Sequence, residues 1–487
     1  MTVAPAPPIA PPSIPAFRPL TAEDVRMVHE ASLRVLEETG VEVSEPEARG
    51  IFAAGGAKQD GDRIRIPSRM VERALETVPH RLVLYGRRPG TELYLDGTRV
   101  YMGTGGMAVN VLDVETGKAR RADLIDSVQI ARLVDALPNI DFYMRPLEAH
   151  DIPSEISDIN RAYAGLAGTA KHFMGGAWSV DAVRDVIRLA ALLAGDEAAL
   201  VERPIMSFVV SWMVSPLRYN PEAVPLLTEI LRRGMPVALS TAPMTGTNSP
   251  ATLAGTLTLL NAEELSGLVY SQLVNPGTPI LYGAVPSAAD LRTGAFVSGA
   301  PEFGLLNAAA AQLAQFYELP LYNSGGTSDS KVPDFQAGYE KALTLVLSAL
   351  AGANYIHHAA GILDSLMTVA LEQYVLDDEV IGAVRRIMRG IEVNADSLAV
   401  DVINQVGPGA HYLAEDHTLR HMRSEFFFPS LADRGTRNRW EGGGSLDARE
   451  RARRRAKEIL GRPQPELIAP DLDARIRAEF DIRVQKG

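Results

Sequence analysis

Cysteine is absent from this chain of 487 residues. Disulfide bonds, thiolate-bound metals, iron–sulfur clusters and thiol nucleophiles are therefore excluded. The chain also lacks a run of about 18 apolar residues, so it contains no segment typical of a transmembrane helix. Acidic side chains outnumber basic ones, and the formal net charge is −12. This balance argues against nucleic acid or an anionic membrane as a partner, and we expect a cytoplasmic protein.

Several catalytic motifs are missing as well. The sequence holds no serine-hydrolase elbow, no phosphate-binding loop and no HExxH helix. The basic segment 449–457 (RERARRRAK) is more typical of a solvated helix face than of a nucleic-acid site. We therefore expect no metal site and no tightly bound cofactor.

The chain divides into four parts. Residues 1–16 contain six prolines and predict a disordered tail. Residues 17–120 predict an N-terminal α+β capping region, which opens with a helix over 21–39 that Gly40 ends. Residues 121–400 predict the main domain, and residues 401–487 a C-terminal extension packed on it.

The main domain alternates strand-like and helix-like segments. Between the strand-like runs lie amphipathic segments, and successive runs start 31 to 43 residues apart, which is typical of right-handed βα units around a parallel sheet. An open doubly wound sheet should show GxGxxG after its first strand, and none is found. We therefore predict a TIM (β/α)8 barrel with one strand still to be located. The seven runs begin near Ile140, Lys171, Pro204, Pro236, Pro279, Pro320 and Ala353.

Residues 321–340 are the most informative stretch. A short apolar run is followed by Gly325-Gly326, a polar loop over 327–331 and a helix after Pro333. In a barrel this order places the polar loop at the carboxyl end of a strand, where active sites lie.

Aromatic side chains recur at the predicted strand ends. Such rings could hold a quaternary ammonium by cation–π attraction, worth roughly 0.5–2 kcal/mol each; alternatively they simply seal the barrel. The candidate substrate-binding residues are Trp178, Trp212, Tyr282, Tyr322 and Asn323, with Tyr101 from the N-terminal region.

His357 and His358 end the seventh run. Adjacent strand residues face opposite ways, so we expect only one of them to point into the barrel. Either substrate contact or a packing role is compatible with the sequence. Glu263 lies on or near an apolar helix face, where a carboxylate must find a partner or shift its pKa.

Five segments resemble the trimethylamine methyltransferase (MttB) superfamily: 261–283 (NAEELSGLVYSQLVNPGTPILYG), 325–343 (GGTSDSKVPDFQAGYEKAL), 373–393 (QYVLDDEVIGAVRRIMRGIEV), 405–434 (QVGPGAHYLAEDHTLRHMRSEFFFPSLADR) and the RWEGGG run around Trp440. The segment 122–141 fits the same pattern. The likeness covers nearly all of the chain after the proline tail.

This resemblance implies a TIM-barrel methyltransferase that moves a methyl group from an amine to the cobalt of a corrinoid protein. The corrinoid would come from a partner protein or as free cob(I)alamin. Archaeal relatives carry pyrrolysine, for which we expect the equivalent position within 327–336; only standard residues stand there. The resemblance then implies a betaine-type quaternary amine as methyl donor. It also implies four catalytic candidates, Glu263, His358, Asp329 and Gln336, with His357 among the substrate contacts.

Alternatives remain open. The donor could be trimethylamine or another tertiary amine, or the protein could be a betaine-binding barrel without catalysis. A lyase or aldolase would need a Schiff-base lysine, for which Lys171 and Lys331 are the candidates. We also expect a homo-oligomer.

Overall fold

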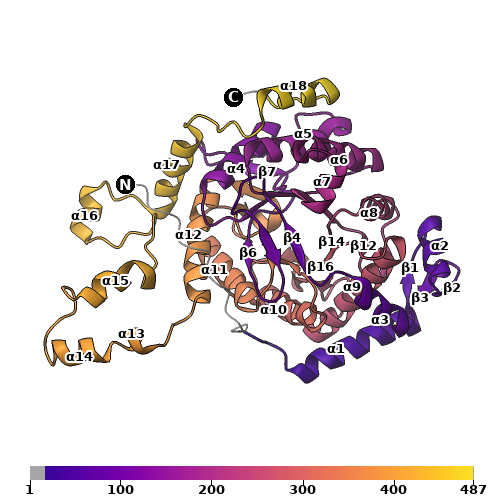
Figure 1. The fold of residues 1–487 in the computed structure, drawn as a ribbon, viewed down its shortest axis with the longest axis horizontal. Helices are drawn as coiled ribbons and strands as arrows, with labels where there is room; N and C mark the ends of the chain where they lie inside the picture. The colour runs from indigo at the N-terminus through magenta and orange to yellow at the C-terminus, as the bar shows by residue number, and fades with distance from the viewer. Residues whose placement is uncertain (1–16, 486–487) are drawn as a thin grey trace.

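Eight parallel strands within the described residues, 17–485, form a closed barrel at the centre of the computed structural model (Figure 1). The tail predicted at 1–16 lies outside the described residues. In chain order the barrel strands are β6 (Tyr101–Met102), β9 (Phe142–Met144), β10 (His172–Gly175), β11 (Met206–Val210), β14 (Val237–Thr241), β16 (Ile280–Ala284), β19 (Tyr322–Ser324) and β20 (Tyr355–His357).

A helix follows each barrel strand and lies outside it, so the predicted (β/α)8 fold is confirmed. All seven predicted strand runs correspond to barrel strands. The outer helices are α4 (Leu124–Ala136), α5 (Ser154–Gly168), α6 (Val180–Ala194), α8 (Ala223–Arg232), α9 (Leu253–Val274), α10 (Pro301–Phe316), α11 (Phe335–Leu350) and α12 (Leu371–Met388), with the short α7 (Glu197–Glu202) after α6.

The eighth strand is β6, which lies in the region predicted as a cap. It pairs in parallel with β20 through Tyr101↔Tyr355 and Met102↔Ile356. On its other side, the amide of Asp141 donates to the carbonyl of Met102 at 2.8 Å, which joins β6 to the start of β9. The barrel therefore begins before residue 121, the boundary that the sequence suggested.

Alternation along the strands divides their side chains between the barrel interior and the helix layer. The interior group includes Phe142, Met174, Ala238, Leu281 and Tyr355. At the amino-terminal end it is completed by leucines of the hairpin β4 (Leu82–Leu84) and β5 (Leu93–Leu95), which closes that end. Chemistry must therefore take place at the opposite end of the barrel.

The remaining N-terminal elements are α1 (Ala22–Arg34), the π-helical turn η1 (Val35–Thr39), β1 (Val41–Glu42), α2 (Pro46–Ala54), β2 (Lys58–Asp60), β3 (Arg63–Arg65) and α3 (Ser68–Thr77). The helical elements α1, η1, α2 and α3 pack on α9, and the strands β1 to β3 form a small sheet that β1 joins to β13 (Arg218–Tyr219). Gly40, with φ of +76°, ends the first helix as predicted.

Short strands lie in the connections that follow the carboxyl ends of the barrel strands. They are β7 (Asn110–Leu112), β8 (Ala119–Arg121), β12 (Met213–Val214), β13 (Arg218–Tyr219), β15 (Met244–Thr245), β17 (Ser287–Asp290), β18 (Ala295–Val297), β21 (Ile362–Leu363) and β22 (Thr368–Ala370), with the 3-10 turn η2 (Asp364–Leu366). In one sheet, β7 pairs with β22, which joins the first and last connections of the barrel.

The C-terminal extension has two unlike parts. The helices α17 (Ala448–Leu460) and α18 (Pro470–Glu479) pack on the barrel helices α12, α4 and α6. Between α12 and α17, the segment 391–428, here called the arm, projects away from the barrel (Figure 1). It contains α13 (Ala395–Leu398), α14 (Val400–Val406) and α15 (Asp416–Glu425); α16 (Arg437–Gly442) follows it.

None of the helices in residues 17–485 combines the length and the apolar character that a membrane span requires.

Candidate functional site

Two histidines and a tyrosine meet inside the barrel near the carboxyl ends of β19 and β20. The ring of His357 stacks on Tyr322, with centroids 4.1 Å apart and planes 12° from parallel. The ring of His358 lies 3.9 Å from that of His357. Both histidines and the tyrosine are buried.

The expectation that only one histidine faces the barrel is wrong. His358 has φ of +66°, so the extended geometry that separates neighbouring side chains ends there. Its Nδ1 lies 2.8 Å from the hydroxyl of Ser324, and Ser324 is the strand partner of His357. Both rings therefore lie at the same end of the barrel.

Glycines after β6 make room for this pair. A Cβ on Gly105 would lie 2.8 Å from the backbone nitrogen of His358 and 3.0 Å from Nδ1 of His357. A Cβ on Gly103 would lie 2.4 Å from the ring of Phe142. The glycine-rich run 103–106 thus lets the first strand end against the histidines.

Both histidines are held neutral. Burial lowers the pKa of His357 well below its ordinary value, and His358 lowers it further. Burial, with a smaller effect of the Lys341 charge, lowers the pKa of His358 to about 3. Neither nitrogen of His357 has a hydrogen-bond partner among residues 17–485. A buried imidazole without a partner leaves two polar atoms for a ligand to use.

A polar frame links the connections that follow β16, β19 and β20. Asp329 accepts hydrogen bonds from the backbone nitrogens of Ser298 and Gly299 and from the hydroxyl of Ser365. Glu340 accepts from the backbone nitrogen of Asp329, at 2.8 Å. Gln336 joins the frame by donating from its amide to Glu340 at 2.9 Å.

Lys341 stabilises two of the connections that this frame links. Its ammonium is buried, donates to the carbonyls of Gly326 and Ile362, and pairs with Asp377 at 3.2 Å. It thereby holds the loop after β19 against the loop after β20. Glu340 and Lys341 were missed by sequence reasoning, although two adjacent charges in an otherwise apolar helix could have suggested a buried role.

Arg145, directly after β9, is a second residue that the sequence did not single out. It is 9% exposed, and its nearest carboxylate contact is 3.7 Å, to Asp158. That carboxylate is bound more closely by Arg161. Burial, together with the charge of Arg161, lowers the pKa of Arg145 to about 10. This arginine therefore retains donors for an anionic group at the barrel end, near the connections after β6 and β10.

Four predicted site residues lie on the outer side of the barrel wall instead. Tyr282 donates from its hydroxyl to Asn261 in α9 at 2.9 Å. Trp212 is fully buried and packs edge-on against Tyr219, with centroids 4.6 Å apart. Asn323 donates to the carbonyls of Ala284 and Asn307. Glu263 accepts from the hydroxyls of Ser215 and Thr241 and from the backbone nitrogen of Leu217.

The last two predicted contacts lie at the two ends of the barrel. Trp178 is 64% exposed on the connection after β10, so its indole lies on the rim. The hydroxyl of Tyr101 accepts a hydrogen bond from the backbone nitrogen of Tyr94 in the closing hairpin. The structure therefore brings together Tyr322, His357 and His358, and holds Asp329 and Gln336 in the polar frame that links the connections after β16, β19 and β20.

The two lysines considered for a Schiff base have other roles. Lys171 donates to the carbonyls of Val134, Leu137 and Ile140. Lys331 is largely exposed and pairs with Asp364 at 3.6 Å. Neither contacts the histidine pair.

Glu264, beside Glu263 in α9, is a buried carboxyl group with one bonded oxygen. Its Oε2 accepts from the backbone nitrogen of Gly283 at 2.9 Å, and its Oε1 has no partner among the described residues. Burial raises its pKa well above the ordinary value of 4.5. The group is therefore neutral in the folded protein at pH values where it is ionised in the unfolded chain.

This difference predicts a pH-dependent effect of Glu264→Gln. The folded protein binds the Glu264 proton more tightly, so wild-type stability falls as pH rises above about 4.5 towards the folded pKa. Glutamine has no proton to lose. The free energy of unfolding of Glu264→Gln, measured in urea, should therefore rise relative to wild type as pH increases from about 4.5 towards the folded pKa, by about 1.4 kcal/mol for each pH unit within that interval. The exposed Glu42→Gln is the control, and a pH-independent difference for Glu264→Gln would contradict the assignment.

Comparison with known proteins gives a consistent picture. Residues 3–487 match the family model described as trimethylamine methyltransferase (MTTB). A glycine betaine methyltransferase of Desulfitobacterium hafniense (strain Y51) is 34% identical over 466 residues, covering 96% of this chain and 97% of that protein. The trimethylamine methyltransferase MttB of Methanosarcina barkeri is 37% identical over 475 residues, covering 95% of this chain and 94% of that protein.

Among solved structures, the monomethylamine methyltransferase MtmB of Methanosarcina barkeri aligns with a TM-score of 0.49 at 11% identity. The alignment covers 90% of this chain and 93% of that one.

Proposed function

The chain belongs to the trimethylamine methyltransferase (MTTB) family, and from this premise we propose that it moves a methyl group from a betaine-type quaternary amine to the cob(I)alamin of a corrinoid protein. The observation that carries the choice of donor is the buried histidine pair, in which the neutral His357 ring stacks on Tyr322 and the neutral His358 ring lies against His357. Neutral rings can lie beside a cation without repelling it, and aromatic faces attract it.

The chemistry of the donor supports the same choice. When the N–CH3 bond of a quaternary ammonium breaks, its electron pair stays on nitrogen and a neutral tertiary amine leaves. No proton is needed at that nitrogen. A tertiary amine donor would need one, and imidazoles with such low pKa values are poor sources of it.

The loop over 327–336 supports a donor other than trimethylamine. Pyrrolysine-containing relatives are expected to place that residue here, and this loop holds ordinary residues whose polar groups bind one another and residues outside the loop. The identities alone do not separate the two donors, since the glycine betaine enzyme and the trimethylamine enzymes are similarly close to this chain.

We assign the betaine carboxylate to Arg145. A guanidinium matches a carboxylate with two parallel hydrogen bonds, and this one is buried beside the barrel end with no carboxylate nearer than 3.7 Å. With the carboxylate at Arg145 and the ammonium at Tyr322, the chain would fix the direction of the N–CH3 bond. Alignment of this kind is the main contribution that a protein can make to a displacement in which the leaving group needs no help.

A corrinoid protein would dock at the carboxyl end of the barrel. Reduced corrinoid supplies the cobalt nucleophile that accepts the methyl group. Large apolar side chains stand exposed on the connections there, as a docking partner requires. They are Met107, Trp178, Leu291, Phe335 and Met367.

The first test is methyl transfer itself. Purified protein mixed anaerobically with cob(I)alamin and glycine betaine should produce the methylcobalamin spectrum. His357→Ala should slow the reaction by roughly 100-fold, because the ring that positions the donor against Tyr322 is lost. The exposed His80→Ala serves as control. Transfer from trimethylamine but from no quaternary amine would contradict the donor, and tight betaine binding without any transfer would identify a binding protein.

Arg145 gives a second test that uses two donors. Arg145→Lys should lower kcat/KM for glycine betaine by roughly 10–100-fold, since a charged hydrogen-bonded pair is lost or weakened. Tetramethylammonium lacks the carboxylate, so its methyl transfer should change little. Equal losses for the two donors would show that Arg145 acts only through the fold, which a thermal unfolding curve of the variant would reveal independently.

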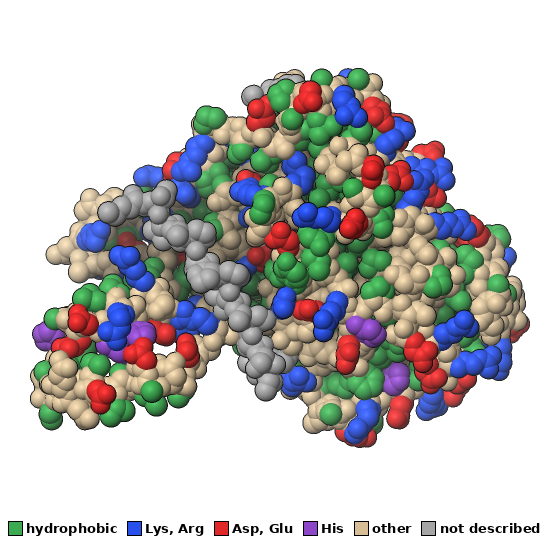
Figure 2. Space-filling view, in the orientation of Figure 1, with side chains coloured by type: hydrophobic (Ala, Val, Ile, Leu, Met, Phe, Trp, Pro, Cys, Tyr) green, Lys and Arg blue, Asp and Glu red, His purple; other side chains and the backbone are tan. Residues whose placement is uncertain are grey.

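We also propose that the chain forms a homo-oligomer through the arm. No residue of 391–428 is buried. Several of its side chains are nevertheless large and apolar: Ile391 is 86% exposed and Leu413 is 81% exposed, and further exposed apolar side chains belong to the same segment. Figure 2 shows green side chains on this lobe at the lower left. A second copy of the chain would cover them.

The oligomer is tested by Ile391→Ser with Leu413→Ser. Because both side chains are exposed, the double change should leave the thermal stability of each subunit nearly unchanged while reducing the mass measured by light scattering after gel filtration. Met27→Ser, an exposed apolar position on α1, is the matched control. A wild-type protein that is monomeric at micromolar concentration would refute the proposal.

A further inference from the structure

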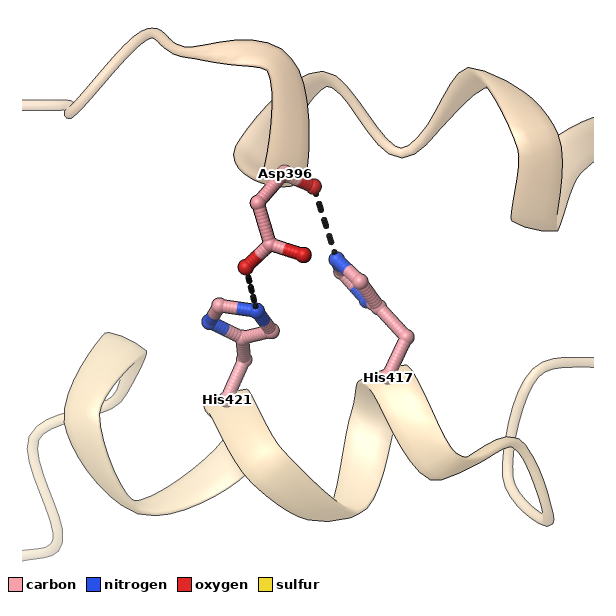
Figure 3. A group of neighbouring side chains, drawn as sticks. All are labelled: Asp396, His417 and His421. Carbon is pink, nitrogen blue, oxygen red and sulfur yellow. Dashed lines mark hydrogen bonds and ion pairs between the residues drawn. The ribbon is translucent and has the colours of Figure 1, made fainter.

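Two helices of the arm meet at a cluster of one carboxylate and two imidazoles (Figure 3). His417 and His421 stand one helical turn apart on α15, and their rings lie 4.3 Å apart. Both point at Asp396 of α13. Nε2 of His421 lies 2.8 Å from the carboxylate oxygen Oδ2, and Nε2 of His417 lies 3.1 Å from the main-chain oxygen.

We propose that Asp396, His417 and His421 bind a divalent transition-metal ion, with zinc as the best-fitting case. One ligand atom from each residue can be chosen so that all three lie within 4.8 Å of one another. Around zinc, with bonds of about 2.0 Å, neighbouring ligands of a tetrahedron lie about 3.3 Å apart. A small closure of the side chains is enough, and water would take the fourth position.

The donor set selects the class of metal. Two imidazole nitrogens and one carboxylate oxygen suit zinc, nickel or copper, whereas calcium and magnesium prefer oxygen ligands only. Each imidazole must offer the lone pair of Nε2, so its proton would reside on Nδ1 in the metal-bound state. The carboxylate of Asp396 offsets part of the ionic charge.

One neighbouring group opposes metal binding. The guanidinium of Arg420 lies 3.5 Å from Oδ1 of Asp396, and its charge repels a cation. This contact is long and exposed, and such pairs contribute little to stability. The arginine side chain can therefore move aside, but removing its charge should make the metal bind more tightly.

A bound metal would stabilise the arrangement of the helices in the arm. With no buried residue, the arm has no hydrophobic core of its own, and Asp396 is the point where α13 contacts α15 through hydrogen bonds. A metal bound across the two helices stabilises their arrangement by its binding free energy. Metal binding here does not depend on the methyl-transfer reaction. The site also differs from the expectation that the chain has no metal site.

The experiment is calorimetric titration of the full-length, untagged and metal-stripped protein with zinc chloride. Wild type should bind one zinc ion per chain in the micromolar range or tighter. His417→Ala, His421→Ala and Asp396→Asn should each weaken this binding by about 10- to 100-fold. His80→Ala should leave it unchanged, and Arg420→Gln should bind zinc at least as tightly as wild type.

Limited trypsin digestion gives a second measurement. Cleavage after Arg423 in α15 should be slower with zinc in the wild type and unaffected by zinc in His417→Ala. The inference is overturned if wild type shows no saturable binding of one zinc ion, or if the three ligand variants bind zinc as well as His80→Ala does. Because the three ligands lie on the surface, unchanged thermal unfolding of the variants will separate lost binding from lost fold.

Discussion

Closure of the barrel through the two residues of β6 is the constraint on which the site depends. Tyr101 and Met102 pair with β20 on one side, and the carbonyl of Met102 accepts from Asp141 at the start of β9 on the other. Once the ring of strands is closed, alternation assigns every strand side chain to the interior or to the helix layer. The leucines of the β4–β5 hairpin fill the amino-terminal end, so the unpaired imidazole of His357 is left at the other end.

The sequence predicted the barrel well because its strands and helices have strong and different periodicities. It assigned the strand near Tyr101 to the N-terminal capping region rather than to the barrel, because two strand residues followed by Gly103 carry no sign of the strands with which they pair. Assignment of site residues was harder, since a shift of one residue moves a side chain to the opposite face. Tyr322 lies inside the barrel, whereas Tyr282, which was proposed for the same role, bonds to α9. His358 does not follow the alternation of side chains along the strand, because its φ of +66° ends the strand.

Charged residues near the barrel end were the least predictable part. Lys341 and Glu340 lie in an otherwise apolar helix, and the structure buries both by supplying carbonyls, hydroxyls and Asp377 as partners. Such partners come from loops far apart in the sequence and leave no periodic trace. Arg145 differs from them because its partners are weak. A buried charge with incomplete partners is costly, and a substrate carboxylate would compensate for that cost.

These features agree with the demands of the proposed reaction. A quaternary ammonium leaves as a neutral amine, so a strong acid near the nitrogen would give no advantage, and neutral histidines are sufficient. What the reaction needs is a dry site that fixes one N–CH3 bond in one direction. Two features help to hold such a site in one arrangement. Gly105 allows the first strand to close against His357, and Lys341 ties together the loops after β19 and β20, which carry the histidine pair. Most polar groups predicted to be catalytic are instead engaged by other groups of the protein. Asp329 and Gln336 hold the frame, which leaves the stacked rings and Arg145 as the groups that we propose to contact the substrate.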